Sequence, residues 1–496
     1  MTAISPRWEW RTFGSGLGSA EDVFDATPSE VHQSDEVYFL SPGGANVKVR
    51  DDLMDIKVLQ EVDDAGLEQW MPVMKAEFPL SGDRAAEVFK ALNTQKPPLA
   101  EETYSLKSFI DRLIEPSPDV RAVKVHKRRT RFVLGDCMAE FTDVTVDGVP
   151  TQTVAVESTH AGAVVAAVRD LGFGDFLNTN YTKGLQAVIE RAPARYAVID
   201  VGTNSVKFHL GERGDDGSWA TVVDRAEVTR LGESLEQEGV IVPAAAERTA
   251  AAIAGMVEEA KSNGALAIAA VGTAGLRIAR NRADVIETIR SRSGVRVEVI
   301  SGEEESRLAY LAVQAGLGIR DGSLVVFDTG GGSTQFTFGA GPKLDDRFSV
   351  DVGAVRYTER FGLSEVVAPD VLAEAKEAIS ADLSSLDDRD APDALVAMGG
   401  AVTNITAVSH SMATYDPDVV QGTVLDRAEI DRQIELYSSL DAEARRSIVG
   451  LQPKRADVIL AGACIVRTVM EKLDQQKLTV SDRGLRHGLV LERFER

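Results

Sequence analysis

A short pattern that occurs twice restricts the fold of this 496-residue chain more than any other feature of its sequence. Residues 197–208 read AVIDVGTNSVKF, and residues 325–336 read VVFDTGGGSTQF. In each, an apolar run ends at an Asp, passes through Gly and small polar residues, and resumes as an apolar alternation. Such a run is typical of a buried strand that enters a hairpin. One copy alone could be an ordinary tight hairpin, but two copies in the same order predict two related lobes that face each other across a cleft.

The turn of each hairpin has the composition of a phosphate-binding loop. Glycine lets the backbone turn sharply and lets a ligand approach the main-chain N–H groups. The two carboxylates, Asp200 and Asp328, are suited to hold a divalent cation directly or through water. We therefore expect each turn to bind phosphate, with the candidate residues Gly202, Thr203, Asn204 and Ser205 in the first loop and Gly330, Gly331, Gly332, Ser333 and Thr334 in the second.

The rhythm of the sequence changes near residue 190. After it, apolar runs that end at glycine, such as LAIAAVGTAG and ALVAMGG, alternate with helical patterns, one of them bounded by Pro243 and Gly264. This alternation predicts an α/β fold with a largely parallel sheet, whose ligands bind outside the carboxyl ends of the strands. Before residue 190 the period is two, as in WEWRTF and NVKVRDDLMDIKVL. That half is expected to be α+β and mainly antiparallel. Its charged faces would line the lumen of a barrel if the sheet closes, and would face solvent if it does not.

The composition limits the partners of the chain. It is 44% apolar, carries a net charge of −23 and has two cysteines far apart in sequence. It shows neither a long apolar segment nor a basic-then-apolar N-terminus, so we expect a cytoplasmic protein with no membrane span. The negative charge argues against general nucleic-acid binding. A polyanionic small ligand would need a local basic site, and RAVKVHKRRTR at 121–131 is a candidate, with an exposed solvated face as the alternative.

The second half carries further motifs in a consistent order. They are RLGES at 230–234, GTAGLRIARN at 272–281, ISGEEESRLAY at 300–310, VGAVRYTERF at 352–361, MGGAVTNITAV at 398–408, RADVILAGACIV at 455–466 and GLRHGLVLE at 484–492. With these motifs, residues 195–496 resemble the exopolyphosphatase and guanosine pentaphosphate phosphatase (Ppx/GppA) family of the actin, sugar kinase and heat-shock ATPase superfamily. The resemblance implies two actin-like lobes, each a mixed sheet flanked by helices. They would span 196–322 and 323–496 after a linker at 191–195, with the C-terminal segment free to return to the first lobe.

The resemblance also implies roles for particular residues. Glu305 in the acidic triplet would be the base that activates a water, with Glu304 as the second choice. Ser301 and Glu304 have the spacing of a capping box, which by itself accounts for Glu304. Arg277 would clamp a phosphate, since a guanidinium is planar and permanently charged; an exposed arginine at a helix start is the alternative.

Residues 1–190 resemble, more loosely, a CYTH-type triphosphate tunnel domain. The resemblance rests on alternating basic strands, on WEWR near the start, on VKVHKRRTRFV, and on AEFTDVTVDG followed by VAVES. RWEWR has one glutamate where such tunnels carry an alternating pair for metal, so the domain is expected to bind a polyanion rather than cleave it. The candidate polyanion-binding residues are Lys124, Lys127, Arg129 and Arg131 in this domain and Arg486 in the second half.

The expected function is metal-dependent hydrolysis of the terminal phosphoanhydride bond of inorganic polyphosphate, with Asp200 and Asp328 beside Mg²⁺ or Mn²⁺. Guanosine pentaphosphate is the alternative substrate, because it ends in the same kind of bond. A catalytically weak sensor is a second alternative: the family pattern continues GGGST with Glu, and this chain has Gln335, which cannot carry charge. A kinase of the same superfamily is a distant third, because the sequence shows no clear sugar site. The resemblance implies a homodimer.

Overall fold

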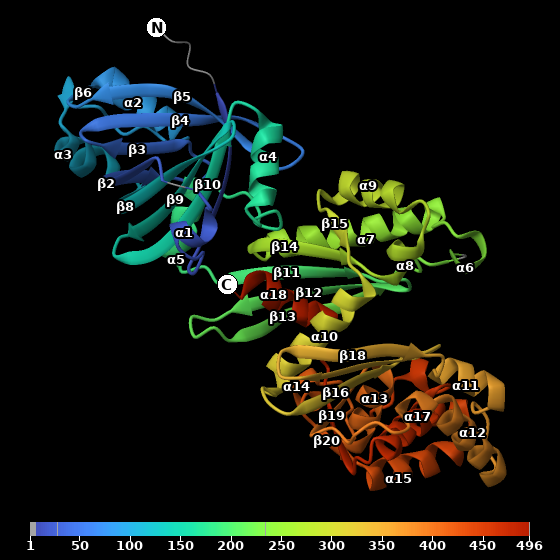
Figure 1. Cartoon of the computed structure of the whole chain (residues 1–496). Coiled ribbons are helices and arrows are strands. Elements are labelled where there is room, and N and C mark those ends of the chain that lie inside the picture. The colour runs from blue at the N-terminus through green and yellow to red at the C-terminus, as the bar shows by residue number, and fades with distance from the viewer. Residues whose placement is uncertain (1–5, 27, 234, 496) are drawn as a thin grey trace. The chain divides into compact units, whose positions relative to one another are not determined.

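The computed structural model describes residues 6–26, 28–233 and 235–495, and it forms two compact units (Figure 1). Unit 1 comprises Met1–Val271, Ile278–Glu298 and Phe494–Arg496. Unit 2 comprises Gly272–Arg277 and Val299–Arg493. In the part of the chain that the structure describes, no helix combines the length and the apolar character that a membrane crossing requires.

The N-terminal half of unit 1 is a closed antiparallel barrel, so of the two arrangements that the sequence left open, barrel and solvated sheet, the structure has the barrel (Figure 1). Its strands are β1 (Arg7–Gly14), β2 (Glu30–Leu40), β3 (Asn46–Arg50), β4 (Leu53–Val62), β5 (Glu68–Glu77), β8 (Arg121–Leu134), β9 (Cys137–Val146) and β10 (Val149–Ser158). They run in the order β1-β10-β9-β8-β2-β3-β4-β5, and β5 pairs again with β1.

Short helices cover the outer wall of the barrel. The helices α2 (Gly82–Ala91) and α3 (Leu106–Phe109) and the π-helical turn η1 (Ile110–Ile114) share one apolar core with β2 to β5. Helix α4 (Ala161–Asp170) packs on a second core around Trp10 and Phe132. The remaining elements are α1 (Ala20–Val23), β6 (Leu80–Ser81) and β7 (Thr103–Tyr104). Because alternate apolar side chains of the strands pack outward against these helices, the charged side chains between them point inward.

Ion pairs occupy part of the lumen of the barrel, beside an apolar core that includes Phe13, Val125 and Tyr181. Glu36 and Glu140 are the two carboxylates at the centre of these ion pairs. Glu36 Oε2 lies 3.1 Å from Lys48 Nζ and 2.9 Å from Lys127 Nζ. Burial opposes ionisation of Glu36, but Lys127 and Lys48 outweigh it and hold the pKa of this carboxyl well below its usual range. Glu140 lies 2.8 Å from Arg11 Nη2 and 3.1 Å from Arg129 Nε.

Helix α5 (Tyr181–Glu190) adds an aromatic side chain to this network. The Tyr181 ring stacks on Tyr38 with centroids 5.5 Å apart, and it meets Phe13 edge-on at 5.3 Å. Lys127 Nζ lies 3.8 Å from the centre of the same ring, and the Arg11 guanidinium carbon lies 4.3 Å from it. Cation–π contacts of this kind compensate part of the cost of burying the two charges.

The first lobe is a five-stranded sheet in the order β13-β12-β11-β14-β15. Its strands are β11 (Ala194–Val201), β12 (Ser205–Arg213), β13 (Trp219–Val228), β14 (Ala265–Gly272) and β15 (Val297–Val299), and its helices are α6 (Leu235–Glu238), α7 (Pro243–Ser262) and α9 (Arg282–Ser293). The helix expected between Pro243 and Gly264 is confirmed, with Pro243 in its first turn. Helix α5 ends at Glu190 and β11 begins at Ala194, so strand structure already starts inside the segment expected to be a linker.

Unit 2 contains a six-stranded sheet in the order β18-β17-β16-β19-β21-β20. The strands are β16 (Ser323–Thr329), β17 (Thr334–Ala340), β18 (Lys343–Val350), β19 (Ala394–Met398), β20 (Val424–Asp426) and β21 (Lys477–Val480). The helices are α8 (Ala274–Ile278), α10 (Gly302–Leu317), α11 (Ala354–Phe361), α12 (Pro369–Asp382), α13 (Gly400–Ser409), α14 (Pro417–Val420), α15 (Arg427–Ser438), α16 (Ala442–Arg445), α17 (Ile459–Lys472) and α18 (Leu485–Phe494), with single 3-10 turns at Ser384–Leu386 and Pro453–Arg455. Helix α17 lies at the centre of the apolar core.

The expectation of a largely parallel sheet is wrong in detail. In unit 2, β16, β19 and β21 are parallel, but β17, β18 and β20 pair antiparallel with their neighbours. In the first lobe, β11, β12 and β13 form an antiparallel meander. Each Gly-rich turn sends the chain back as a hairpin rather than into a helix, so the sheet of unit 2 is mixed, as the family resemblance implied, and the first-lobe sheet contains an antiparallel meander.

The lumen pairs make the stability of the barrel sensitive to acid. Burial disfavours the charged form of Glu140, but Arg11 and Arg129 outweigh that cost and lower its pKa to about 2. The pKa of an unfolded Glu is about 4.3. Above that pH the ionised Glu140 therefore contributes about 3 kcal/mol to the free energy of unfolding, and this contribution is lost as the pH falls toward about 2. We expect Glu140→Gln to lower the urea midpoint at neutral pH and to reduce the slope of stability with pH between about 5 and 2. Fluorescence of Trp8, Trp10 and Trp70, all on barrel strands, reports the transition.

The matched control is Asp143→Asn on the same strand. The Asp143 side chain is 47% exposed and lies 3.6 Å from Arg128, so its loss should change the midpoint little. Equal effects of the two substitutions would contradict a stabilising role for the lumen pairs.

Candidate functional site

The two copies of the repeated pattern fold as the same hairpin. In the first lobe, Asp200 on β11 lies opposite Lys207 on β12, and the Gly202 N–H donates to the Ser205 carbonyl at 3.1 Å. In unit 2, Asp328 on β16 lies opposite Gln335 on β17, and the Gly330 N–H donates to the Ser333 carbonyl at 2.9 Å. The carboxylate, the turn and the hydrogen bond that closes the turn therefore occupy equivalent places in the two hairpins, as the repeated pattern predicted.

Asp200 is a buried carboxylate with an open acceptor. The residue is 4% exposed, and its Oδ2 lies 3.3 Å from Lys207 Nζ. Within the described residues, its Oδ1 has no hydrogen-bond partner. A buried carboxylate oxygen without a donor is costly unless a cation or a donor satisfies it, so this geometry fits a metal ligand. Lys207 was not singled out from the sequence, although it follows Asp200 at the spacing at which Gln335 follows Asp328.

Residues 230–233 of the RLGES motif, whose Ser234 lies outside the described residues, support the first loop. The Arg230 N–H donates to the Asn204 carbonyl at 2.9 Å, and the Gly232 N–H donates to the Thr203 carbonyl at 2.7 Å. A Cβ on Gly232 would lie 2.2 Å from the Thr203 side chain, so only glycine allows this approach. The motif therefore fixes the loop that carries the candidate phosphate-binding residues.

The second loop is held by the start of α11. The Ala354 N–H donates to the Gly330 carbonyl at 3.0 Å, and the Val355 N–H donates to the Gly331 carbonyl at 2.8 Å. Thr334 is fully buried, and its hydroxyl donates to the Val352 carbonyl at 2.7 Å. The side chain of Thr334 thus ties the hairpin to the segment between β18 and α11, and a role for Thr334 in phosphate binding stays a prediction.

Asp328 lies against the loop that connects β19 to α13. A Cβ on Gly399 would lie 2.0 Å from Asp328 Oδ1, and Gly399 has φ +87°, so this position requires glycine on both counts. A Cβ on Gly400 would lie 2.5 Å from an Arg455 guanidinium nitrogen. The two glycines of the MGGAV motif therefore let a carboxylate and a guanidinium approach the carboxyl end of β19. Arg455 was quoted in a motif but was not chosen as a site residue.

The acidic triplet begins helix α10, and its second glutamate is engaged in the helix itself. Ser301 caps the helix by accepting from the Glu304 N–H at 3.1 Å, which confirms the Ser301 half of the predicted capping box. Arg307 donates to both oxygens of Glu304, at 2.8 and 2.6 Å. These hydrogen bonds hold the pKa of Glu304 below its usual value. The contacts of Glu304 are thus explained by its role at the start of the helix, without a catalytic role.

Glu305 faces Arg277 instead. Nη1 and Nη2 of Arg277 lie 3.2 and 3.3 Å from Glu305 Oε2, and Nη1 also donates to the Ile300 carbonyl at 2.9 Å. Both side chains are 30% exposed, so a small ligand in solvent can reach them. Two residues chosen from separate motifs are therefore brought together in unit 2.

A second arginine lies beside this pair. Arg347 on β18 forms an ion pair with Glu303, and its Nη1 lies 3.8 Å from the position that a Cβ on Gly302 would occupy. Arg277 Nη2 lies at the same distance from that position. Arg347 stands in no motif of the sequence, and no sequence signal could have selected it.

The basic residues predicted to bind a polyanion lie in different places. Lys124 is exposed on the outer wall, whereas Lys127 and Arg129 are buried in the lumen with Glu36 and Glu140. Arg131 forms an ion pair with Glu30, and Arg486 lies in the first turn of α18. Polyanion binding by these residues stays a prediction.

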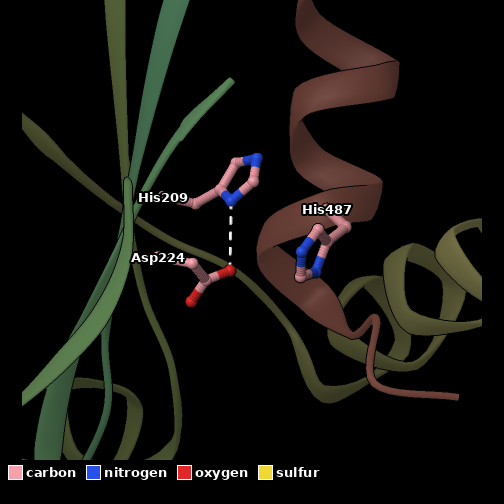
Figure 2. A group of neighbouring side chains, drawn as sticks. All are labelled: His209, Asp224 and His487. Atoms are coloured by element: carbon pink, nitrogen blue, oxygen red, sulfur yellow. Dashed lines mark hydrogen bonds and ion pairs between the residues drawn. The ribbon is translucent and has the colours of Figure 1, made fainter. Parts of the chain in front are cut away.

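One further pair on the first-lobe sheet was not singled out from the sequence. His209 on β12 and Asp224 on β13 are cross-strand neighbours, and their side chains meet at 3.1 Å (Figure 2). His209 is 4% exposed. The pair is a polar contact between a buried histidine and an exposed aspartate on two strands of the meander that carries Lys207.

Known proteins match the region that contains these groups. The chain is 29% identical over 320 residues to Exopolyphosphatase 2 of Mycobacterium tuberculosis, which spans 60% of this chain and 98% of that protein. It is 27% identical over 311 residues to the bifunctional 3-dehydroquinate synthase/phosphatase of Fusobacterium nucleatum, spanning 60% of this chain but only 46% of that protein. The crystal structure of the Ppx/GppA phosphatase of Aquifex aeolicus matches with a TM-score of 0.57 and 30% identity, over 61% of this chain and 99% of that one.

These matches confirm the two-lobed actin-like fold of the second half, and they confirm a phosphohydrolase at the level of the family. Residues 212–496 match the sequence profile of the Ppx/GppA phosphatase family. The chain belongs to the Ppx/GppA phosphatase family.

Proposed function

We propose that this protein is an exopolyphosphatase that hydrolyses the terminal phosphoanhydride bond of inorganic polyphosphate and releases orthophosphate. The observation that carries the proposal is the contact of Glu305 with Arg277 at the start of α10, in a chain with two Asp–Gly hairpins of the same geometry. Hydrolysis of such a bond needs a group that accepts a proton from water and cations that neutralise phosphate oxygens. The similarity to Exopolyphosphatase 2 supports the same substrate class.

In this proposal Glu305 accepts the proton of the attacking water, and Arg277 binds oxygens of the terminal phosphoryl group. The contact between Arg277 and Glu305 describes the enzyme without substrate. A guanidinium that binds a carboxylate through two hydrogen bonds binds a phosphate in the same way, so the phosphoryl group can take the place of Glu305. When Arg277 turns to the phosphate, the Glu305 carboxylate is released toward water. The N–H groups of Gly202 to Ser205 and of Gly330 to Ser333 are the proposed donors to further phosphate oxygens.

Asp200 and Asp328 are the proposed carboxylate ligands for divalent cations, Mg²⁺ or Mn²⁺. The unsatisfied Oδ1 of Asp200 supports this assignment, and Lys207 supplies a positive charge at the other oxygen. The cation, when bound, supplies charge neutralisation for the phosphate chain.

A catalytically weak polyphosphate sensor is the second candidate, and Gln335 is the observation that favours it. Gln335 is exposed at the position opposite Asp328, where it offers a neutral amide rather than a carboxylate. Guanosine pentaphosphate remains the alternative substrate, since the proposed groups contact phosphate only. The barrel, with Lys124, Lys127, Arg129 and Arg131, is proposed to bind polyanion without cleaving it.

The first test measures orthophosphate release from long-chain polyphosphate, with Mg²⁺ and with chelator, for wild type and Glu305→Gln. Loss of the proton acceptor should lower kcat by about 10²- to 10⁴-fold, since general-base catalysis contributes that much. The matched control is Glu304→Gln, one residue away and bonded to Arg307, which should retain most of the activity. Equal release by wild type and Glu305→Gln would move the base elsewhere. No release from polyphosphate or from guanosine pentaphosphate would favour the sensor.

The second test concerns the residue opposite Asp328. We expect Gln335→Glu to lower the Mg²⁺ concentration at half-maximal rate several-fold, because a second carboxylate beside Asp328 strengthens cation binding. Gln476→Glu, at an exposed position of the same unit, adds the same charge elsewhere and should leave the Mg²⁺ dependence unchanged. An unchanged Mg²⁺ dependence in Gln335→Glu would show that this position does not face the cation.

A further inference from the structure

We infer that Arg347 is a substrate-binding residue that holds a phosphate group of the polyphosphate chain other than the terminal one held by Arg277. The inference rests on the proposed function and adds to it a residue that lies outside every motif of the sequence. It follows from the position of two guanidinium groups and from the carboxylates that they contact.

The two guanidinium groups converge on one point. Arg277 Nη2 and Arg347 Nη1 each lie 3.8 Å from the position of a Cβ on Gly302. The distance between the two nitrogen atoms is therefore at most twice that value. Neighbouring phosphate groups of a linear chain can bridge such a gap, and each would meet a planar fork of donors.

The carboxylate that Arg347 contacts is easily displaced. Glu303 has a side chain that is 76% exposed, and an ion pair with so exposed a partner contributes little stability. A phosphate oxygen forms the same kind of charge-assisted hydrogen bond to the guanidinium, and a polyphosphate chain brings several such oxygens. Glu303 thus pairs with Arg347 as Glu305 pairs with Arg277. A polyphosphate chain would take the place of both carboxylates.

The neighbouring acid does not neutralise Arg347. Asp346 pairs with Arg389 at 2.7 Å, and this hydrogen bond holds the pKa of Asp346 below its usual value. Arg389 in turn lies over the rings of Phe338 and Phe348, with its guanidinium carbon 4.7 and 5.3 Å from their centres. Asp346 and Arg389 are therefore committed to each other, and Arg347 on the edge strand β18 remains available to a ligand that displaces Glu303.

Arg389 also provides the matched control. The side chains of Arg347 and Arg389 are both 34% exposed, and each pairs with one carboxylate. Replacing either by Ala removes one positive charge from unit 2, and the two arginines lie on opposite faces of β18, since Arg389 contacts Asp346 and Phe348. A difference between the two variants therefore reports position rather than net charge.

The test measures binding of tripolyphosphate by calorimetry in the full chain that carries Glu305→Gln, so that hydrolysis does not interfere. Arg347→Ala should weaken the Kd about tenfold, Arg347→Lys should restore part of the loss, and Arg389→Ala should stay within about twofold. Glu303→Gln should tighten binding about threefold, because it removes the competing carboxylate. In the otherwise native enzyme, Arg347→Ala should raise the KM for polyphosphate with kcat within about twofold. A thermal melt of each variant confirms that it is folded.

The outcomes separate the inference from the proposed function. If Arg347→Ala and Arg389→Ala bind tripolyphosphate equally, or if Glu303→Gln weakens binding, the inference is overturned even when the native enzyme releases orthophosphate. If the native enzyme releases none while tripolyphosphate binding still depends on Arg347, the hydrolase proposal fails and Arg347 stands as a phosphate-binding residue.

Discussion

The close approach of side chains to the backbone of particular glycines is the constraint on which the candidate site depends. Asp328 Oδ1 occupies the space that any side chain at Gly399 would need, and Gly232 makes room for Thr203 in the same way. Such contacts tolerate no Cβ, so the glycines at these places fix where strands end and where polar groups stand. The hydrogen bonds that join each loop to the segment behind it then hold the turns in position.

Much of this arrangement follows from the sequence, because the relevant signals are local. The Asp–Gly hairpins, the cap at Ser301 and helix α7 each depend on residues within a few positions of one another. Period-two charge alternation likewise predicted a sheet whose charged face could point inward, and the closed barrel confirms it. Local pattern was sufficient wherever hydrogen bonding and burial are decided by neighbours along the chain.

The rest depends on contacts between distant segments. Arg347 meets Glu303 through the packing of β18 beside α10, and nothing in its own neighbourhood marks it. The same is true of the mixed sheet order, since an apolar run does not reveal whether its partner strand is parallel. Glu304 and Glu305 are adjacent and chemically identical, yet Arg307 contacts one and Arg277 the other. Only the three-dimensional structure shows that Glu304 and Glu305 have different partners.

The short connection between the barrel and the first lobe has a consequence for how this chain can be divided. Residues 175–177 hydrogen-bond to β14, through Leu177 N–H to the Leu266 carbonyl and Ile268 N–H to the Asp175 carbonyl. The Phe176 ring also packs on Tyr196 and Phe494. The barrel domain thus supplies part of the first lobe's sheet and apolar packing. A truncation that begins at residue 194 would leave backbone groups of β14 and an aromatic face in water, so the natural boundary of the catalytic half lies before Asp175 rather than in the RAPAR segment.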